Sequence, residues 1–150
     1  MLEKHFPNLK LKNQYDENFD INTINSQFIL LYFYPKDMTP GCTTQAVAIR
    51  DAWQDILDLN CNVIGVSKDS PKRHLSFVEK YDLPFTLLSD PEGILCDEFG
   101  VWVEKSMFGK KYMGIERSSF LLDAERRVIQ QWKKVKPANH ISDVIEFLSS

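Results

Sequence analysis

Residues 28–34 read FILLYFY, an uninterrupted apolar run that Pro35 ends. A run of this length is typical of a strand in the middle of a parallel sheet, where both faces are buried. Similar runs follow at residues 63–67 and 84–88, and apolar residues at helical spacing lie between them. Because strands and helices alternate, the sequence predicts an α/β fold with a central sheet.

The helices of this fold are indicated by spacing and by their first residues. After the first strand, apolar residues recur at helical spacing at Ala46, Ile49, Trp53, Ile56 and Leu57. Ser70-Pro71 offers an N-cap followed by proline at the first helical position. Asp90-Pro91 repeats this start signal, and Gly100 is expected to end the short helix that it opens.

The last third of the chain predicts a different arrangement. Residues 119–123 and 128–132 favour an antiparallel hairpin, although the turn between them lacks the usual glycine. Asn139 is expected to cap a final amphipathic helix, and residues 103–116 are expected to form a surface loop. Together these elements predict a mixed central sheet flanked by helices. A length of 150 residues suits one domain.

Composition excludes several classes of function. The chain is 43% hydrophobic and 26% charged with a formal charge of -3, which gives no reason to expect nucleic-acid binding. The basic clusters Lys110-Lys111 and 133–136 are interpreted as solvated faces. No apolar run is long enough to cross a membrane, and the first residues lack the apolar core of a signal peptide, so a cytoplasmic protein is expected.

Three cysteines, Cys42, Cys61 and Cys96, form no CxxC pair, which argues against a disulfide framework and a zinc site. Cys42 follows the carboxyl end of the first strand, where open α/β sheets place their functional crevice. It also lies at the start of a helical pattern, and a helix N-terminus stabilises a thiolate. Position alone leaves two interpretations open, a nucleophile or a small buried hydrophobe.

The neighbours of Cys42 favour the nucleophile. Thr39 can turn its hydroxyl toward the sulfur or toward an oxygen bound there. Pro40 has no N–H and can screen a thiolate from water, and Pro35 fixes the chain as it leaves the strand. Either proline alone would be explained by turn chemistry.

These residues carry a resemblance to a known family. Pro35-x-x-x-Thr39-x-x-Cys42 resembles the active-site motif of the peroxiredoxins. FYPKDxTPGCT at residues 33–43 is similar to the Q-type subfamily, which is named for the bacterioferritin comigratory protein. The resemblance covers roughly residues 28–148 and continues through residues 65–69, 84–90, 99–102, 110–115 and 117–121, whereas the first 27 residues match poorly.

The resemblance implies a single thioredoxin-like domain over residues 1–150 that reduces hydrogen peroxide and organic hydroperoxides as an antioxidant enzyme. Cys42 would be the peroxidatic cysteine, oxidised to a sulfenic acid, and Thr39 and Arg117 would share the catalysis. An arginine suits this role because its guanidinium stays charged and offers several donors. Pro35, Pro40 and Gly41 would position the site.

The resemblance also implies partners. Thioredoxin or a small thiol would recycle the enzyme, without metal or organic cofactor, and the chain would be a monomer or a weak homodimer. Neither nucleic acid nor a membrane is expected as a partner, because of the net charge and the short apolar runs described above.

The sequence does not decide which group resolves the sulfenic acid. Many members of the subfamily carry a resolving cysteine five residues after the peroxidatic one, where this chain has Val47. Cys61 begins the second strand, on the order of 20 Å away at the far end of the intervening helix, whereas a disulfide needs Cα atoms within about 7 Å, so Cys61 is the least favoured of three routes. Cys96 is expected on the same side of the sheet as Cys42 and is the better internal candidate. An external thiol is the third route.

Other residues and other functions also fit parts of the sequence. The three histidines, His5, His74 and His140, are scattered and are expected at the surface or in caps. The aromatic residues Trp102, Phe108 and Tyr112 suit a peroxide pocket, an oligomer contact or ordinary packing. The competing function is a redox-responsive binding protein that signals through oxidation of Cys42 without efficient turnover. A thioredoxin-type disulfide oxidoreductase is a weaker alternative, because the sequence has no CxxC.

Overall fold

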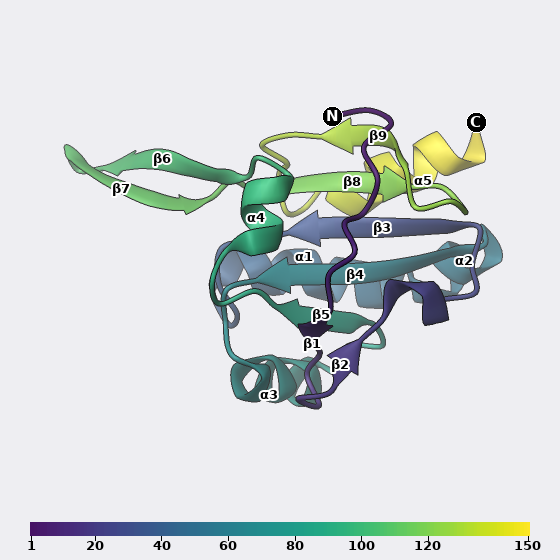
Figure 1. Cartoon of the computed structure of the whole chain (residues 1–150), viewed down its shortest axis with the longest axis horizontal. Coiled ribbons are helices and arrows are strands. Elements are labelled where there is room, and N and C mark those ends of the chain that lie inside the picture. The colour runs from purple at the N-terminus through teal and green to yellow at the C-terminus, as the bar shows by residue number, and fades with distance from the viewer.

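The computed structural model describes residues 1–150 as a seven-stranded sheet with helices on both faces and a separate two-stranded hairpin (Figure 1). The order in the large sheet is β2-β1-β5-β4-β3-β8-β9. Its strands are β1 (Leu11–Lys12), β2 (Asn18–Phe19), β3 (Phe28–Phe33), β4 (Cys61–Ser67), β5 (Thr86–Ser89), β8 (Ser118–Leu122) and β9 (Val128–Trp132). The mixed α/β fold expected from the sequence is confirmed.

The strand β3 lies in the middle of the sheet, as its apolar run predicts. It pairs in parallel with β4, and β4 pairs in parallel with β5, whereas β8 runs antiparallel to β3. Successive side chains of a strand point to opposite faces. Leu30 and Tyr32 therefore pack into the core on one face, and Leu31 and Phe33 into the core on the other.

The helices divide between these two cores. In Figure 1, α1 (Pro40–Asp51) and α2 (Trp53–Asp58) lie behind the sheet and α4 (Ile94–Glu98) lies in front. Residues of α1, α2, α3 (Pro71–Tyr81) and α5 (His140–Ser149) share the first core, and residues of α4 belong to the second. None of the helices is long and apolar enough to span a bilayer.

The N-terminal region forms strands that the sequence does not predict. Leu11 and Lys12 of β1 pair with β2, and Lys12 also pairs with Ser89 of β5, so the first residues extend the sheet. Before β1 the chain pairs with β9 and then crosses the front of the sheet (Figure 1). A short turn, η1 (Ile21–Thr23), follows β2. Strands of two residues are too short to show alternation, which explains the omission.

Several predicted boundaries were wrong by a few residues. The helix after Cys42 is split at Ala52 into α1 and α2, and the third strand begins at Thr86 rather than Pro84. Asp90-Pro91 forms a turn, and α4 starts only after Gly93, which has φ of 72°. Asn139 precedes α5, as expected, but its side chain makes no cap hydrogen bond.

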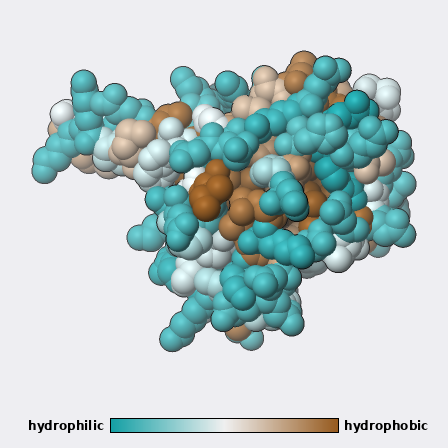
Figure 2. All heavy atoms as spheres, viewed as in Figure 1, coloured by the Kyte–Doolittle hydropathy of each residue, from teal (hydrophilic) through white to brown (hydrophobic).

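The prediction of a surface loop at 103–116 was wrong. This segment forms the hairpin of β6 (Trp102–Met107) and β7 (Lys110–Ile115), which projects from the body as an arm (Figure 1). Phe108 and Gly109 form its two-residue turn, both with positive φ, as in a type I′ turn. Figure 2 shows the arm, at the left, covered mostly by hydrophilic side chains. Because only Ile115 at its base is buried, the strands lack the alternation that reveals a strand in a sequence.

The C-terminal hairpin was predicted correctly. β8 and β9 are antiparallel neighbours, and the turn between them manages without glycine. Arg126 takes the left-handed conformation with φ of 65°, and the Asp123 carboxylate accepts hydrogen bonds from the backbone N–H groups of Glu125 and Arg127. This hairpin also places Arg117, the residue before β8, close to the end of β3.

Candidate active site

Residues 34–39 connect the carboxyl end of β3 to α1, and Cys42 lies in the first turn of that helix. Thr39 precedes the helix as N-cap, Pro40 takes the first position, and the Thr39 side chain makes no cap hydrogen bond. The first N–H groups of a helix have no partner within it, and here no side chain replaces one. These N–H groups and the helix dipole favour negative charge at the sulfur of Cys42, a residue that is only 2% exposed.

Arg117, the residue before β8, contacts Cys42 of α1. Its Nη1 donates to Cys42 Sγ at 3.4 Å and to Gln45 Oε1 at 2.7 Å. The approach is close over Gly41, where an added Cβ would lie 3.2 Å from Arg117 Nη2. Gly41 therefore leaves room for the guanidinium. Residues that are 75 positions apart thus meet at one sulfur atom.

Gln45 and His140 continue this arrangement into the core, and the sequence analysis assigned neither to the site. Gln45 Nε2 lies 3.1 Å from His140 Nδ1, and His140 Nε2 lies 2.5 Å from Ser119 Oγ. His140 is buried rather than at the surface, so its expected placement was wrong. Gln45 could have been found, because it follows Cys42 by one helical turn on the same face.

The other predicted residues surround Cys42 with different contacts from those expected. The Thr39 hydroxyl donates to the Lys36 carbonyl at 2.8 Å and not to the sulfur. Its lone pairs stay free for another donor. Pro40 is exposed at the start of α1, and Pro35 is half-buried just after β3. A hollow of about 440 Å³ opens on the outer side of Arg117, between Lys105 of the arm and Lys134.

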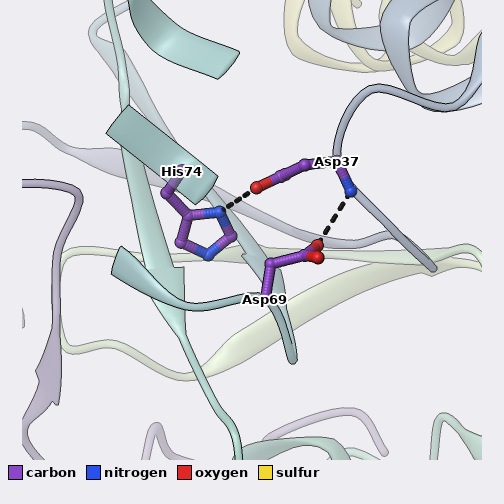
Figure 3. Close-up of side chains that lie close together, drawn as sticks. All are labelled: Asp37, Asp69 and His74. Carbon is purple, nitrogen blue, oxygen red and sulfur yellow. Dashed lines mark hydrogen bonds and ion pairs between the residues drawn. The ribbon is translucent and has the colours of Figure 1, made fainter. Parts of the chain in front are cut away.

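The loop that carries Thr39 is held by a buried cluster around Asp37 (Figure 3). The Asp37 carboxylate lies 2.6 Å from His74 Nδ1 and accepts from the Tyr34 hydroxyl at 2.5 Å. The Asp37 backbone N–H donates to Asp69 at 2.8 Å, and Arg73 donates to its carbonyl at 3.1 Å. Asp37 therefore fixes the chain five residues before Cys42.

The residues Asp37, Asp69 and His74 lie within 4.8 Å of one another, a spacing that suits a metal ion. Their atoms are already occupied, however. His74 Nε2 lies 2.9 Å from the Leu88 carbonyl and Nδ1 lies against Asp37, so both ring nitrogens already have oxygen partners. Ser67 and Arg73 donate to the Asp69 carboxylate. The cluster is a hydrogen-bonded clamp, and its histidine, like His140, was expected at the surface but is fully buried.

Comparison with known proteins agrees with this geometry. The model of the AhpC/TSA family matches residues 2–131. Peroxiredoxin Bcp of Bacillus subtilis is 48% identical over 142 residues, which are 95% of this chain and 90% of that protein. Peroxiredoxin Bcp of Escherichia coli K12 is 42% identical over 142 residues, with coverage of 95% and 91%. The chain belongs to the AhpC/TSA family, in its peroxiredoxin Q branch.

Solved structures place this peroxiredoxin in the same fold. Peroxiredoxin Q of Xanthomonas campestris superposes with a TM-score of 0.87 at 39% identity, covering 94% of this chain and 89% of the other. PrxQ of Xylella fastidiosa gives a TM-score of 0.92 at 34% identity, with coverage of 99% and 95%. The predicted thioredoxin-like fold and thiol-dependent peroxidase activity are confirmed. The family match also spans residues 2–27, which resemble the subfamily poorly in sequence.

The other two cysteines of this peroxiredoxin are buried in unreactive surroundings. Cys61 begins β4, and burial raises the pKa of its thiol to about 12. Burial and then the charge of Asp90 raise the pKa of Cys96 further. Cys96 belongs to the core in front of the sheet and Cys42 to the core behind it. Both cysteines follow the carboxyl ends of parallel strands, β3 for Cys42 and β5 for Cys96, so they share that edge of the sheet as expected, but α1 and α4 cover opposite faces of it.

Two stacked tyrosines beside the clamp provide a test of its strength. Tyr32 and Tyr34 lie 5.4 Å apart between ring centroids, and both hydroxyls are buried. Burial and then the charge of Asp37 raise the pKa of Tyr34, so its hydroxyl stays a donor to Asp37. Tyr34→Phe is expected to lower the free energy of unfolding by about 1.5–3 kcal/mol, the range for a hydrogen bond to a charged group.

The matched control is Tyr32→Phe, because the Tyr32 hydroxyl has no hydrogen-bond partner. Removing a buried hydroxyl that is unsatisfied is expected to leave stability unchanged or to raise it. Urea unfolding of both variants at neutral pH measures the difference. Equal losses in the two variants would show that ring packing, not the bond to Asp37, holds the loop.

His140 predicts a pH dependence of stability. Burial and then the charge of Arg117 lower the pKa of His140 to about 4. The unfolded chain, with an ordinary histidine pKa near 6.5, binds more protons between these values, so stability falls as the pH drops from 6.5 toward 4. From about pH 7.5 to about pH 5 this one group is expected to remove about 2 kcal/mol.

The contribution of His140 is isolated by comparing wild type with His140→Asn in urea unfolding across this pH range. We expect the stability difference between the two proteins to narrow by about 2 kcal/mol as the pH falls, since the variant has no group to titrate at that position. A difference that stays constant with pH would contradict the neutral state of His140.

Proposed function

We propose that Cys42 is the peroxidatic residue of this enzyme and that hydrogen peroxide and organic hydroperoxides are its substrates. The observation that carries the proposal is the Arg117 guanidinium, which lies 3.4 Å from the sulfur of a cysteine in the first turn of a helix. Both features stabilise an anionic sulfur, and a thiolate rather than a thiol is the nucleophile. The Xanthomonas campestris bacterioferritin comigratory protein, 38% identical, is described as having alkyl peroxide reduction activity.

The reaction follows from the charges at the site. The Cys42 thiolate attacks the terminal oxygen of the peroxide, the S–O bond forms, and the O–O bond breaks. The sulfur loses two electrons, and the departing oxygen receives them as an alkoxide or hydroxide that takes up a proton. Negative charge thus moves from sulfur to the departing oxygen, where Arg117 offers further N–H donors. The products are the Cys42 sulfenic acid and an alcohol or water.

The remaining predicted site residues have positioning roles in this proposal, except Thr39. The Thr39 hydroxyl has lone pairs left to accept a hydrogen bond from the peroxide, since its own hydrogen is held by Lys36. Pro35 and Pro40 bracket the loop, and Gly41 leaves space for Arg117. The Asp37 clamp then holds this loop before the substrate arrives, which reduces the ordering that binding requires.

An external thiol completes the cycle in this proposal. Attack on the sulfenic acid by one reductant thiol gives a mixed disulfide and water, and a second thiol releases Cys42. Cys96 and Cys61 are poor resolving residues in this conformation, because burial raises the pKa of both thiols. A disulfide between Cys42 and Cys96 would also require residues from opposite faces of the sheet to meet.

The proposal extends to partners and location. Thioredoxin or a small thiol is the reductant, and the 150-residue chain acts as one domain in a monomer or weak homodimer. A cytoplasmic location suits a cycle that consumes reduced thiols. The kinship with peroxiredoxins favours turnover over the alternative of a binding protein that only signals its oxidation.

A turnover assay tests the proposal. The protein is mixed with excess hydrogen peroxide and with dithiothreitol, glutathione or a thioredoxin system, and the loss of peroxide is followed. Consumption of many equivalents with at least one reductant is expected. Consumption that stops after one equivalent with every reductant would instead indicate the redox-responsive binding protein.

A further inference from the structure

A chain of buried polar groups leads from the candidate active site to the start of α5. Arg117 contacts Gln45, Gln45 contacts His140, and His140 contacts Ser119, with distances of 2.7, 3.1 and 2.5 Å. Gln45 and Ser119 are fully buried and His140 is 2% exposed. The reaction proposed for Cys42 does not involve His140. Buried polar groups of this kind are nevertheless stable only when all of them have hydrogen-bond partners.

The direction of each hydrogen bond follows from the chemistry of the groups. A guanidinium can only donate, so Gln45 must present its carbonyl oxygen to Arg117. The amide nitrogen of Gln45 then points to His140 Nδ1 and donates to it. His140 Nδ1 must therefore be unprotonated, and the ring proton on Nε2 donates to Ser119 Oγ. The neutral ring agrees with its burial and with the nearby charge of Arg117.

The space around Gln45 does not by itself choose the orientation of its amide. The oxygen and nitrogen of a glutamine amide are nearly the same size, and only hydrogen-bond partners distinguish them. A reversed amide would point N–H donors at the Arg117 guanidinium and would push Nη1 away from Cys42. An acceptor on the His140 side prevents this reversal, because only the Gln45 nitrogen can donate to it.

We propose that His140 is a positioning residue for peroxide reduction: by accepting a hydrogen bond from Gln45, it keeps the Gln45 oxygen on Arg117 and so holds Nη1 against the Cys42 sulfur. The proposal rests on the roles proposed above for Cys42 and Arg117. His140 lies 98 positions after Cys42 in the chain and touches neither the sulfur nor the substrate. The proposal nevertheless assigns it a defined effect on the rate of Cys42 oxidation.

A pair of substitutions separates this effect from loss of packing. His140→Asn keeps an acceptor oxygen where Nδ1 lies, whereas His140→Gln keeps a polar group only near Nε2. Both substitutions remove the His140 ring, whose centroid lies 5.8 Å from that of Tyr32, so both lose the same aromatic contact. The readout is the second-order rate constant for oxidation of Cys42 by hydrogen peroxide in a single turnover.

We expect His140→Gln to slow this oxidation about tenfold and His140→Asn to stay within about threefold of wild type, since one neutral hydrogen bond separates them. Equal rates in the two variants would overturn the proposal. In a Gln45→Met background the same two substitutions are expected to give equal rates, because the residue through which His140 acts is gone. A tenfold gap that persists in this background would also overturn it.

A measurement on the unaltered protein keeps the proposal falsifiable if a variant does not fold. Nitrogen-15 NMR of histidine at neutral pH is expected to show His140 neutral with its proton on Nε2. A proton on Nδ1 would overturn the proposal. The two proposals fail differently: wild type that leaves Cys42 unoxidised refutes the proposed function, whereas fast wild type with indistinguishable variants refutes the role of His140 alone.

Discussion

Replacing Arg117 with glutamine is expected to slow the oxidation of Cys42 by hydrogen peroxide roughly a hundredfold to a thousandfold. The guanidinium is the one cation that contacts the sulfur, and it also contacts Gln45. Without the guanidinium, the Cys42 thiolate is less stable before the reaction, and the departing oxygen has no charged hydrogen-bond donor in the transition state. Stopped-flow fluorescence or competition with a peroxidase of known rate measures the change.

Two further variants show whether geometry or charge is responsible. Arg117→Lys keeps the charge but not the fork of donors, so we expect a rate between those of wild type and Arg117→Gln. The matched control is Arg126→Gln, which removes a guanidinium whose contacts are backbone carbonyls of Ile24, Ser26 and Asp123. We expect the control to react at the wild-type rate. An Arg117→Gln protein as fast as the control would remove Arg117 from the catalysis.

The second large effect is expected from Cys42→Ser. The substitution keeps the shape of a buried side chain but replaces the sulfur by a hydroxyl, which is not ionised at neutral pH and cannot take up the oxygen. Peroxide consumption with any thiol reductant should fall to the background rate, while circular dichroism and urea unfolding show a folded protein. Residual turnover above the background would mean that another group reduces peroxide.

The other cysteines serve as controls for this result. Cys61→Ser is expected to retain turnover, since Cys61 packs at the start of β4. Cys96→Ser is expected to retain turnover too if an external thiol resolves the sulfenic acid. Loss of turnover in Cys96→Ser, with a normal first oxidation of Cys42, would instead identify Cys96 as the resolving residue and would imply that α1 or α4 rearranges.

The part of the fold that positions Cys42 could be predicted from the sequence because strong local signals coincide there. The apolar run at 28–34 needs burial on both faces, Pro35 ends it, and Pro40 suits the first position of a helix. The arm formed by β6 and β7 carries no such signal. Apart from Ile115, no residue of its strands is buried, so pairing with each other, rather than burial, determines most of their structure.

The buried histidines show more clearly why part of the site could not be predicted from the sequence. His74 and His140 lie in helices that are amphipathic by pattern, and a histidine in such a helix fits the exposed face equally well. Their burial depends on partners far away in the chain, Asp37 for His74 and Gln45 for His140. Arg117 is a similar case, since only the family resemblance selected it from the other arginines. A single sequence contains no record of such long-range pairs.

The most direct test of the account is the fate of the Cys42 sulfur during one turnover. Reduced protein is mixed with one equivalent of hydrogen peroxide without reductant, trapped with a sulfenic-acid reagent, and analysed by intact mass and peptide mapping. We expect one molecule of the reagent on Cys42, which marks a sulfenic acid formed as fast as the peroxide disappears. Peroxide that disappears while Cys42 stays reduced, or reagent found first on Cys61 or Cys96, would contradict the account.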